Sequence, residues 1–464
     1  MHFTLDEILK ATGGQLTKPD ARLPMPVIIT GVSTDTRTLR DGDLFVPLRG
    51  PRADGHDFIA DAFHRGAAAA LSARPANGLP SGAVLIRVDD PLRALGRIAR
   101  AYRRTLTVTV VGVTGSVGKT TTTKLCAAVL GRAFAVASTK EVWNAEIGVP
   151  LTLLGLTVEH GVAVIEMAMR GLGQIAELVE MAAPSIGVVT SISEAHLEHL
   201  GSRENIARAK GELVAGLPDD GVAVLNRDDE LVSGLARLCR GRVMTYGLAG
   251  PADVRADQVR FEPAGMTFRL LAGRKHTDAR LPAWGRHNVA NALAATAVGL
   301  VLGMDLDAIA AGMAGWTPPA MRLQPMQLDD ILVINDAYNS SPSSVRAALD
   351  VLEEAGRGHR LVAVLGEMRE LGAQSPELHR DVGRDVARRK IAFLLAVGGG
   401  AGVIGEGAAA GGMDSDRIEH ALTLEEATTR LRTLLQPGDV VLIKGSRLLH
   451  LERIVEALYS QIRP

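Results

Sequence analysis

Hydrophobic positions in this chain form short runs rich in valine and isoleucine, separated by longer stretches with helical spacing. Runs of this length, bounded by Gly, Pro, Asn and Asp, are typical of buried strands. The pattern predicts strands over 27–33, 44–48, 83–88, 108–113, 162–165, 186–190, 331–335, 361–365, 391–397 and 440–443. Because strands alternate with helices in the central and last parts, we expect mostly parallel sheets covered on both faces.

Helix signals fill many of the intervals between these strands. Thr4 followed by Glu7 is a capping-box pattern, and Gly13 is a helix-ending residue. We expect helices over 5–12, 62–71, 93–104, 206–212, 289–304 and 341–355, from Lys119, and at the end of the chain. The turn residues at 41–43 predict that strand 44–48 pairs with strand 27–33. The basic residues of 93–104 should form a solvated helix face.

A glycine-rich turn after the strand at 108–113 is the most informative local motif. Gly115 to Gly118 is followed by Lys119 and Thr120 at the start of a helix. Glycines let successive backbone N–H groups point at one anion, and the positive end of the helix holds that anion. Lys119 would reach the terminal phosphates of a nucleotide, and the Thr120 hydroxyl would ligate Mg²⁺. We therefore expect ATP binding here; an ordinary strand–turn–helix connection is the alternative.

Polar residues follow two further predicted strands. Glu166 comes directly after the run 162–165, and His196 lies just beyond the run 186–190. Ligands of open parallel sheets bind at the carboxyl ends of strands, so both side chains should stand near the phosphates. A carboxylate there could hold Mg²⁺. A solvent-facing acid and an exposed histidine at a helix start are the structural alternatives.

Several other residues allow two interpretations. Lys210 lies in a helical stretch where most lysines are solvated, and Asn288 and Asn291 can cap a helix or bond a purine. The segment 33–37 can bind an anionic ligand or form an Asx-type turn. The tract 398–412 contains a dinucleotide-type glycine pattern, but its eight glycines favour a flexible loop.

Length and composition set the broad class. The chain has 464 residues, too many for one core, and the Thr-Pro-Pro at 317–319 marks a break. We predict an α/β protein of three domains: a small α/β domain over 1–104, a central P-loop ATPase domain with a mostly parallel sheet over 105–317, and a Rossmann-like domain over 318–464.

Charge, apolar segments and cysteine content argue against nucleic-acid-binding, membrane and secreted disulfide-rich proteins. The formal net charge of −1 argues against a broad surface for nucleic acid or anionic lipid. We expect no secretion signal and no membrane span, because no basic start leads into an apolar run and the most apolar helix contains Asn291. Cys126 and Cys239 are too few for a disulfide framework, and Cys126 should pack inside its helix. These features predict a cytoplasmic protein.

The motifs together resemble those of the Mur ligase family. The common phosphate-binding motif has its first glycine at the position of Val113, directly before the loop 114–120. A loop without that glycine is the normal form in the Mur ligase family. Further matching motifs are 33–37, 42–45, 54–56, 285–292, 336–343, 366–372 and 443–447. The resemblance covers nearly the whole chain, and it implies an ATP-dependent, ADP-forming acid–amino-acid ligase of peptidoglycan synthesis.

The resemblance also assigns roles to residues. It implies that Lys119, Glu166, His196 and Lys210 are catalytic, and that Thr120, Glu166, His196 and a carbamylated Lys210 hold Mg²⁺. Residues implied to bind ATP are Gly115, Ser116, Val117, Gly118, Lys119, Thr120, Thr121, Asn288, Asn291, Arg322 and Asp336. Residues implied to bind the other substrates are Ser33, Asp35, Arg37, Asn144 and Asn339.

Within the family, Asn144 to Pro150 and the Asp-Ala-Tyr-Asn at 336–339 are similar to the branch that joins D-alanyl-D-alanine to UDP-N-acetylmuramoyl-tripeptide. This implies small-molecule partners, an acyl-phosphate intermediate and a monomer. The chain departs from that branch at Ala145 and at 169–172. Alternatives are a diaminopimelate- or lysine-adding ligase, folylpolyglutamate synthetase, a P-loop ATPase switch, and a non-catalytic nucleotide-sugar-binding protein.

Overall fold

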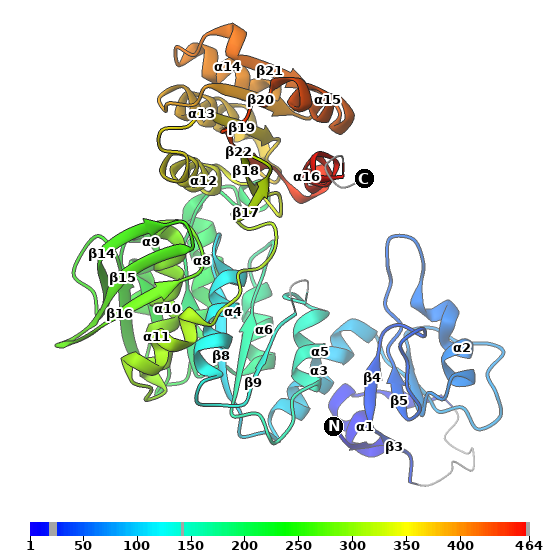
Figure 1. The fold of residues 1–464 in the computed structure, drawn as a ribbon. Coiled ribbons are helices and arrows are strands. Elements are labelled where there is room, and N and C mark those ends of the chain that lie inside the picture. The colour runs from blue at the N-terminus through cyan, green and yellow to red at the C-terminus, as the bar shows by residue number, and fades with distance from the viewer. Residues whose placement is uncertain (18–25, 141–142, 461–464) are drawn as a thin grey trace.

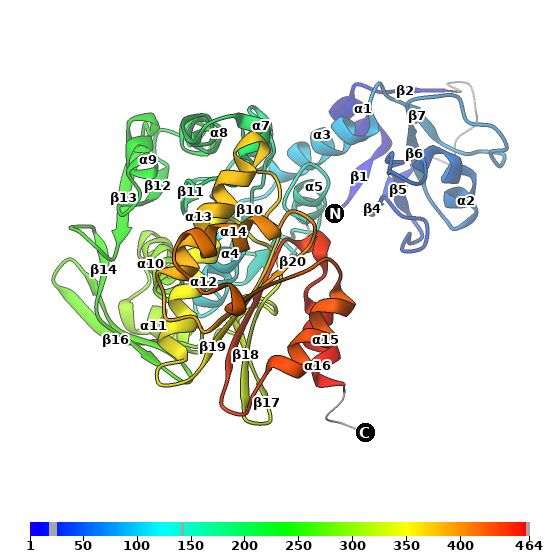
Figure 2. The same ribbon diagram turned by 90° about the horizontal axis from the view of Figure 1, so that it is seen from above.

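The computed structural model describes residues 1–17, 26–140 and 143–460 and has a three-part α/β architecture. Figure 1 shows the first part in blue beside the cyan and green central part, with the yellow-to-red last part above the central one. Figure 2, viewed from above, shows the last part lying over the central part while the first part projects to the side. This arrangement confirms the predicted fold class; the domain boundaries at 104 and 317 stay predictions.

The first part is built on a five-stranded sheet of order β2-β7-β6-β5-β4, in which β4 to β7 run parallel. Its strands are β1 (Phe3–Thr4), β2 (Gln15–Leu16), β3 (Ile28–Ile29), β4 (Gly31–Ser33), β5 (Asp43–Phe45), β6 (Ala69–Ser72) and β7 (Leu85–Arg87). Its helices are α1 (Leu5–Thr12), α2 (Ile59–His64) and α3 (Pro91–Arg103). The Thr4–Glu7 capping box starts α1 and Gly13, at φ 67°, ends it, as predicted.

Two of the elements expected in this part were wrong. The helix expected over 62–71 ends at His64, because Gly66 turns the chain at φ 96° and the following alanines form buried β6 in the middle of the sheet. Burial in the sheet overrides the high helix propensity of alanine. The strand expected over 27–33 divides into β3, which pairs with β1, and β4, which pairs with β5 in parallel.

Helix α3 joins the first part to the central part. Its apolar face contributes to one continuous core that runs from the first sheet to the helices of the central part. Tyr102 donates a hydrogen bond to the carbonyl of Leu156 at 2.7 Å, and the Arg103 guanidinium donates to the carbonyls of Ala182, Leu106 and Val108. The solvated basic face predicted for 93–104 is therefore wrong at Arg103.

The central sheet has the order β16-β15-β14-β13-β12-β11-β8-β10-β9. Its strands are β8 (Thr109–Thr114), β9 (Val136–Ser138), β10 (Val162–Glu166), β11 (Ile186–Val189), β12 (Val222–Asn226), β13 (Arg242–Gly247), β14 (Val254–Glu262), β15 (Gly265–Ala272) and β16 (Lys275–Leu281). Strands β8 to β14 pair in parallel, whereas β14 to β16 form an antiparallel edge that the sequence analysis did not anticipate.

Helices cover the central sheet. They are α4 (Lys119–Leu130), α5 (Gly148–Leu154), α6 (Gln174–Ala182), α7 (Leu197–Leu200), α8 (Arg203–Ala215), α9 (Glu230–Ser233), α10 (Arg286–Val301) and α11 (Leu306–Ala314). Helix α4 packs against α10 in a second apolar core, and Cys126 is buried there as predicted. Among the described residues, none of the helices combines the length and the apolar character that crossing a bilayer requires.

The last part has a six-stranded sheet of order β17-β18-β22-β19-β20-β21, parallel except at β17. Its strands are β17 (Gln324–Leu328), β18 (Ile331–Asp336), β19 (Leu361–Gly366), β20 (Phe393–Val397), β21 (Ile418–Ala421) and β22 (Val440–Lys444). Its helices are α12 (Pro342–Ala355), α13 (Ser375–Ala387), α14 (Gly402–Ala410), α15 (Leu424–Leu434) and α16 (Glu452–Tyr459).

The glycine-rich tract of the last part is not the flexible loop that we expected. Residues 402–410 form α14, which packs closely against α13. A Cβ atom at Gly407 would lie 2.1 Å from the carbonyl oxygen of Arg380, and one at Gly383 would lie 2.0 Å from that of Ile404. The glycines at these two positions allow two helices to approach each other.

A buried histidine fixes the loop after β19. His379 of α13 is 1% exposed, accepts a hydrogen bond from the Met368 amide at 2.9 Å and donates one to the Ser375 carbonyl at 2.7 Å. This pattern requires a neutral ring. Burial lowers the pKa of His379, although the Ser375 carbonyl and Glu367 act in the opposite direction.

We predict that His379→Phe destabilises the protein by about 1–3 kcal/mol at pH 7, because the buried Met368 amide loses its acceptor. The free energy of unfolding of the wild type should fall as the pH drops below about 6.5, because the unfolded chain then binds a proton that the folded ring excludes. Thermal unfolding at pH 7 and pH 5.5 measures both effects. His379→Phe should reduce this pH dependence, and exposed His64→Gln is the control.

Candidate active site

One large cleft, with a volume of about 1010 Å³, lies between the central and last parts. Its floor comes from segments that follow the carboxyl ends of β8, β10 and β11, and from the start of α10. Its other wall comes from the segments after β18, β19 and β22 of the last part. The polar residues predicted at several strand ends therefore do meet at one edge of the central sheet.

The loop between β8 and α4 has the geometry of a phosphate cradle. Gly115 and Gly118 have φ angles of 152° and 88°, where side chains are strained. A Cβ at Gly115 would lie 1.8 Å from the Thr190 hydroxyl, and one at Gly118 would lie 2.5 Å from the Asn291 side-chain oxygen. The Val117 carbonyl accepts a hydrogen bond from the hydroxyl of Thr190 at 2.6 Å. Thr190 directly follows β11, so the end of this strand helps to fix the loop.

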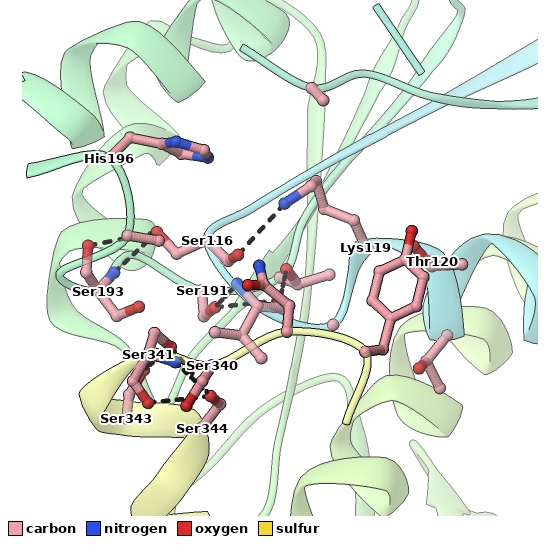
Figure 3. Close-up of a pocket in the computed structure, with 18 of the residues that line it drawn as sticks. Ser116, Lys119, Thr120, Ser191, Ser193, His196, Ser340, Ser341, Ser343 and Ser344 are labelled. Atoms are coloured by element: carbon pink, nitrogen blue, oxygen red, sulfur yellow. Dashed lines mark hydrogen bonds between the residues drawn. The ribbon is translucent and has the colours of Figure 1, made fainter. Parts of the chain in front are cut away.

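Lys119 and Thr120 begin α4 at the mouth of this loop. The Lys119 ammonium donates to the carbonyls of Gly115 and Ser116 at 2.8 and 3.2 Å. Figure 3 marks the contact with Ser116. Burial lowers the pKa of Lys119, and the Arg322 charge adds to the effect, whereas Glu166 and Glu370 oppose it. The Thr120 hydroxyl accepts a hydrogen bond from Arg322 at 3.2 Å. Two cations therefore lie beside the cradle, an arrangement suited to a polyphosphate.

Glu166 ends β10 and lies inside the cleft. It is only 3% exposed, and its carboxylate accepts a hydrogen bond from the Asn144 amide at 2.9 Å. Its backbone N–H donates to the Thr139 hydroxyl at 2.9 Å. The solvent-facing alternative for Glu166 is therefore wrong, and Asn144 directs one carboxylate oxygen.

His196 occupies the N-cap position of α7 with φ 66°, and its side chain contacts the last part. Its Nδ1 lies 2.5 Å from a carboxylate oxygen of Glu370, and this contact is the largest cause that lowers the pKa of Glu370. The Glu198 amide also donates to the Glu370 carbonyl at 3.1 Å. Figure 3 shows His196 on one side of the cradle loop at Ser116 and the serines of 340–344 on the other.

Lys210 is not the solvated lysine that its helical context suggested. It is 1% exposed in α8, and it lies outside the set of side chains that line the cleft. Burial and the nearby Lys119 charge hold the pKa of Lys210 well below its ordinary range. Both effects favour the neutral amine over the ammonium.

The two asparagines of α10 line the cleft, and their side chains bond to neighbouring groups. Asn288 donates to the Trp284 carbonyl at 2.8 Å, and Asn291 donates to the Asn288 side chain at 3.1 Å. Asn291 also accepts from the Thr122 hydroxyl at 3.2 Å. These contacts tie α10 to α4 next to the cradle.

The residues predicted to bind the other substrates separate into two groups. Asn144 and Asn339 line the cleft, but Ser33, Asp35 and Arg37 lie in the first part and do not. The Arg37 amide donates to the Asp35 carboxylate at 2.9 Å, which is the Asx-type turn given as the alternative. The Arg37 guanidinium holds the pKa of Asp35 down to about 2.

Some cleft residues were not assigned from the sequence. Lys444 at the end of β22 pairs with Asp336 at 2.6 Å and is 2% exposed. Arg369, Glu370 and Arg447 follow β19 or β22 and also line the cleft. Charged residues at the ends of these two parallel strands or a few positions beyond them were the signal that could have found these side chains.

Comparisons with known proteins cover the whole length of the chain. Family models described as "Mur ligase family, catalytic domain", "Mur ligase middle domain" and "Mur ligase, glutamate ligase domain" match residues 28–103, 113–299 and 321–447. The UDP-N-acetylmuramoyl-tripeptide–D-alanyl-D-alanine ligase of Bacillus subtilis is 38% identical over 98% of both chains.

Solved structures agree with the sequence comparison. MurF from Acinetobacter baumannii superposes with a TM-score of 0.92 at 32% identity, covering 99% of both chains. MurF from Thermotoga maritima in complex with ADP has a TM-score of 0.83 at 28% identity, covering 93% of this chain and 97% of that one. The resemblance inferred from the motifs is confirmed: the chain belongs to the Mur ligase family.

Proposed function

We propose that this protein is an ATP-dependent ligase that joins D-alanyl-D-alanine to UDP-N-acetylmuramoyl-tripeptide in peptidoglycan precursor synthesis. The observation that carries the proposal is a phosphate cradle whose cleft is completed by charged residues of a second domain. The names of full-length relatives and the ADP bound by the Thermotoga relative support the substrates and the nucleotide. A cytoplasmic location and a monomeric state remain predictions from the sequence.

An amide does not form readily from a carboxylate and an amine in water, because the carboxylate oxygen is a poor leaving group. In the proposed reaction the carboxylate of the tripeptide attacks the γ-phosphorus of ATP, and the bond to the ADP oxygen breaks. The amine of the dipeptide then attacks the carbonyl carbon of the acyl phosphate. Phosphate leaves, and the nitrogen loses a proton.

The cradle residues stabilise charge in the first step. Lys119 and the N–H groups at the start of α4 would contact the terminal phosphates, and Arg322 would approach them from the last part. The amides of Ser116 and Val117 donate to Ser191 and hold the loop in shape. Phosphoryl transfer depends mainly on positioning and on charge stabilisation of this kind. Both domains line the cleft, so closure of the last domain over the substrates would exclude water that hydrolyses the acyl phosphate.

The donor set in the cleft fits Mg²⁺. The Thr120 hydroxyl and the buried Glu166 carboxylate are hard oxygen ligands, and Ser193 has a buried hydroxyl without a hydrogen-bond partner in the described structure. Within the described ranges, no group of three or more His, Cys, Asp or Glu is arranged around a metal position. This sparse set suits an ion that takes most ligands from phosphate and water. Bound Mg²⁺ would neutralise charge on the phosphates.

A second ion would use His196 and a modified Lys210. A protonated lysine cannot bind a cation, but a neutral amine reacts with CO₂ to give a carbamate with two oxygen ligands. The lowered pKa of buried Lys210 supports this proposal, because it makes the neutral amine accessible.

The remaining roles follow the family resemblance. We propose that Asn288 and Asn291 face the adenine, Asp336 the ribose, and Asn144 and Asn339 the peptide substrates. Ser33, Asp35 and Arg37 would bind the uridine diphosphate end of the long nucleotide substrate, outside the cleft. The other ATP-binding residues, Gly115 to Thr121, all belong to the cradle segment.

We predict that the wild type releases phosphate from ATP only when UDP-N-acetylmuramoyl-tripeptide and D-alanyl-D-alanine are both present. Lys119→Ala should lower this rate about 100- to 1,000-fold, because it removes a cation aimed at the transferred phosphoryl group. Exposed Lys275→Ala is the matched control. Equal rates with diaminopimelate, lysine or glutamate as the acceptor, or release without any acceptor, would contradict the proposed function.

We predict that Lys210→Ala loses most turnover and that excess bicarbonate does not restore it. Carbon-13 NMR with labelled bicarbonate should give a carbamate signal in the wild type that is missing in Lys210→Ala. Lys275→Ala again serves as the control. Near-normal turnover of Lys210→Ala, or an unchanged spectrum, would remove the carbamate from the mechanism.

A further inference from the structure

The segment that carries Arg322 has an unusual backbone. Met321 and Leu323, on either side of Arg322, have φ angles of 57° and 53°, a left-handed conformation that residues other than glycine rarely adopt. Such a conformation costs of order 1–3 kcal/mol and persists only where surrounding contacts enforce it. Two of the three residues 321–323 adopt this conformation. The fold therefore specifies the direction of the Arg322 side chain.

Contacts from the end of β18 enforce this conformation. The Leu323 amide donates to the Asp336 carboxylate at 3.1 Å, and the Tyr338 amide donates to the Met321 carbonyl at 3.2 Å. The other Asp336 oxygen is held by Lys444 at 2.6 Å. The segment around Arg322 is therefore pinned to the strand end that carries Asp336 and Tyr338.

The Arg322 guanidinium then extends to the cradle across the face of an aromatic ring. Its central carbon lies 4.1 Å from the centroid of the Tyr338 ring, and one nitrogen donates to the Thr120 hydroxyl at 3.2 Å. Lys119, a second cation, lies next to Thr120. Like charges repel, so the guanidinium needs an attractive surface to stay there, and the negative face of an aromatic ring provides one.

We propose that Tyr338 is a positioning residue whose ring holds the Arg322 guanidinium at the phosphate end of the cleft. The role rests on the proposed function, because it sets the geometry of a cation that acts on the nucleotide. Tyr338 acts on the nucleotide only through Arg322. The aromatic ring makes this contact, and the phenolic hydroxyl is not required for it.

The test measures binding of the ATP analogue AMP-PNP with Mg²⁺ by calorimetry, and kcat/KM for ATP by phosphate release. Tyr338→Leu should weaken AMP-PNP binding and lower kcat/KM for ATP about tenfold each, a loss between those typical of exposed and of desolvated cation–π contacts. Tyr338→Met gives a second non-aromatic variant, and thermal unfolding checks that each variant is folded. Tyr338→Phe should keep at least half of the wild-type affinity.

A double-mutant cycle separates positioning from a general structural role. In an Arg322→Gln background, Tyr338→Leu should cause no further loss, because the partner of the ring is gone. Tyr459→Leu is the matched control: it removes a half-buried tyrosine of the same domain, which bonds the Gln327 carbonyl outside the cleft. It should leave AMP-PNP affinity unchanged.

Three outcomes would overturn the positioning role: wild-type affinity in both non-aromatic variants, an equal loss in Tyr338→Phe, or a full additional loss in the Arg322→Gln background. Failure of the proposed function is a separate result. A wild type that ignores D-alanyl-D-alanine but shows the expected AMP-PNP pattern would refute the acceptor and leave the Tyr338 role intact.

Discussion

The architecture of the site depends on a steric constraint at the turn between β8 and α4. Gly115 and Gly118 have backbone angles suited to glycine, and neither has room for a Cβ, because Thr190 and Asn291 occupy that space. A neighbouring strand and helix α10 therefore shape the loop from two sides. The backbone amides are held in place by packing, so little ordering of the loop is needed when an anion binds.

Positive charge is concentrated around this turn at an electrostatic cost to the folded protein. Lys119 and Arg322 lie beside it, and Glu166 and Glu370 offset part of the Lys119 charge. Buried or crowded like charges destabilise a fold unless they are paired. This repulsion and the strained backbone at Met321 and Leu323 both lower the stability of the folded protein. Such features are typical of ligand-binding sites, where contacts with the bound ligand offset their cost.

The sequence predicted the features governed by local physics. The capping box at Thr4, the valine-rich strands and the Gly-Lys-Thr turn were each specified by a few neighbouring residues. Errors arose where tertiary packing decided the outcome. An alanine run became the buried strand β6, and part of the glycine tract 398–412 became helix α14, which packs closely against α13. Lys210 could not be recognised as buried, because its burial depends on partners far away in the sequence. The ring under Arg322 likewise joins residues that only the fold brings together.

Helix α3 has one further consequence. Its apolar side chains belong to a core shared by the first and central sheets, and its Arg103 is tied to carbonyls of the central part. Cutting the chain after residue 104 would leave apolar surface exposed on both fragments and would separate four backbone carbonyls from their donors, Tyr102 and Arg103. The amino-terminal part, residues 1–104, is thus no detachable module, and the shared core restricts how far its sheet can move relative to the cleft.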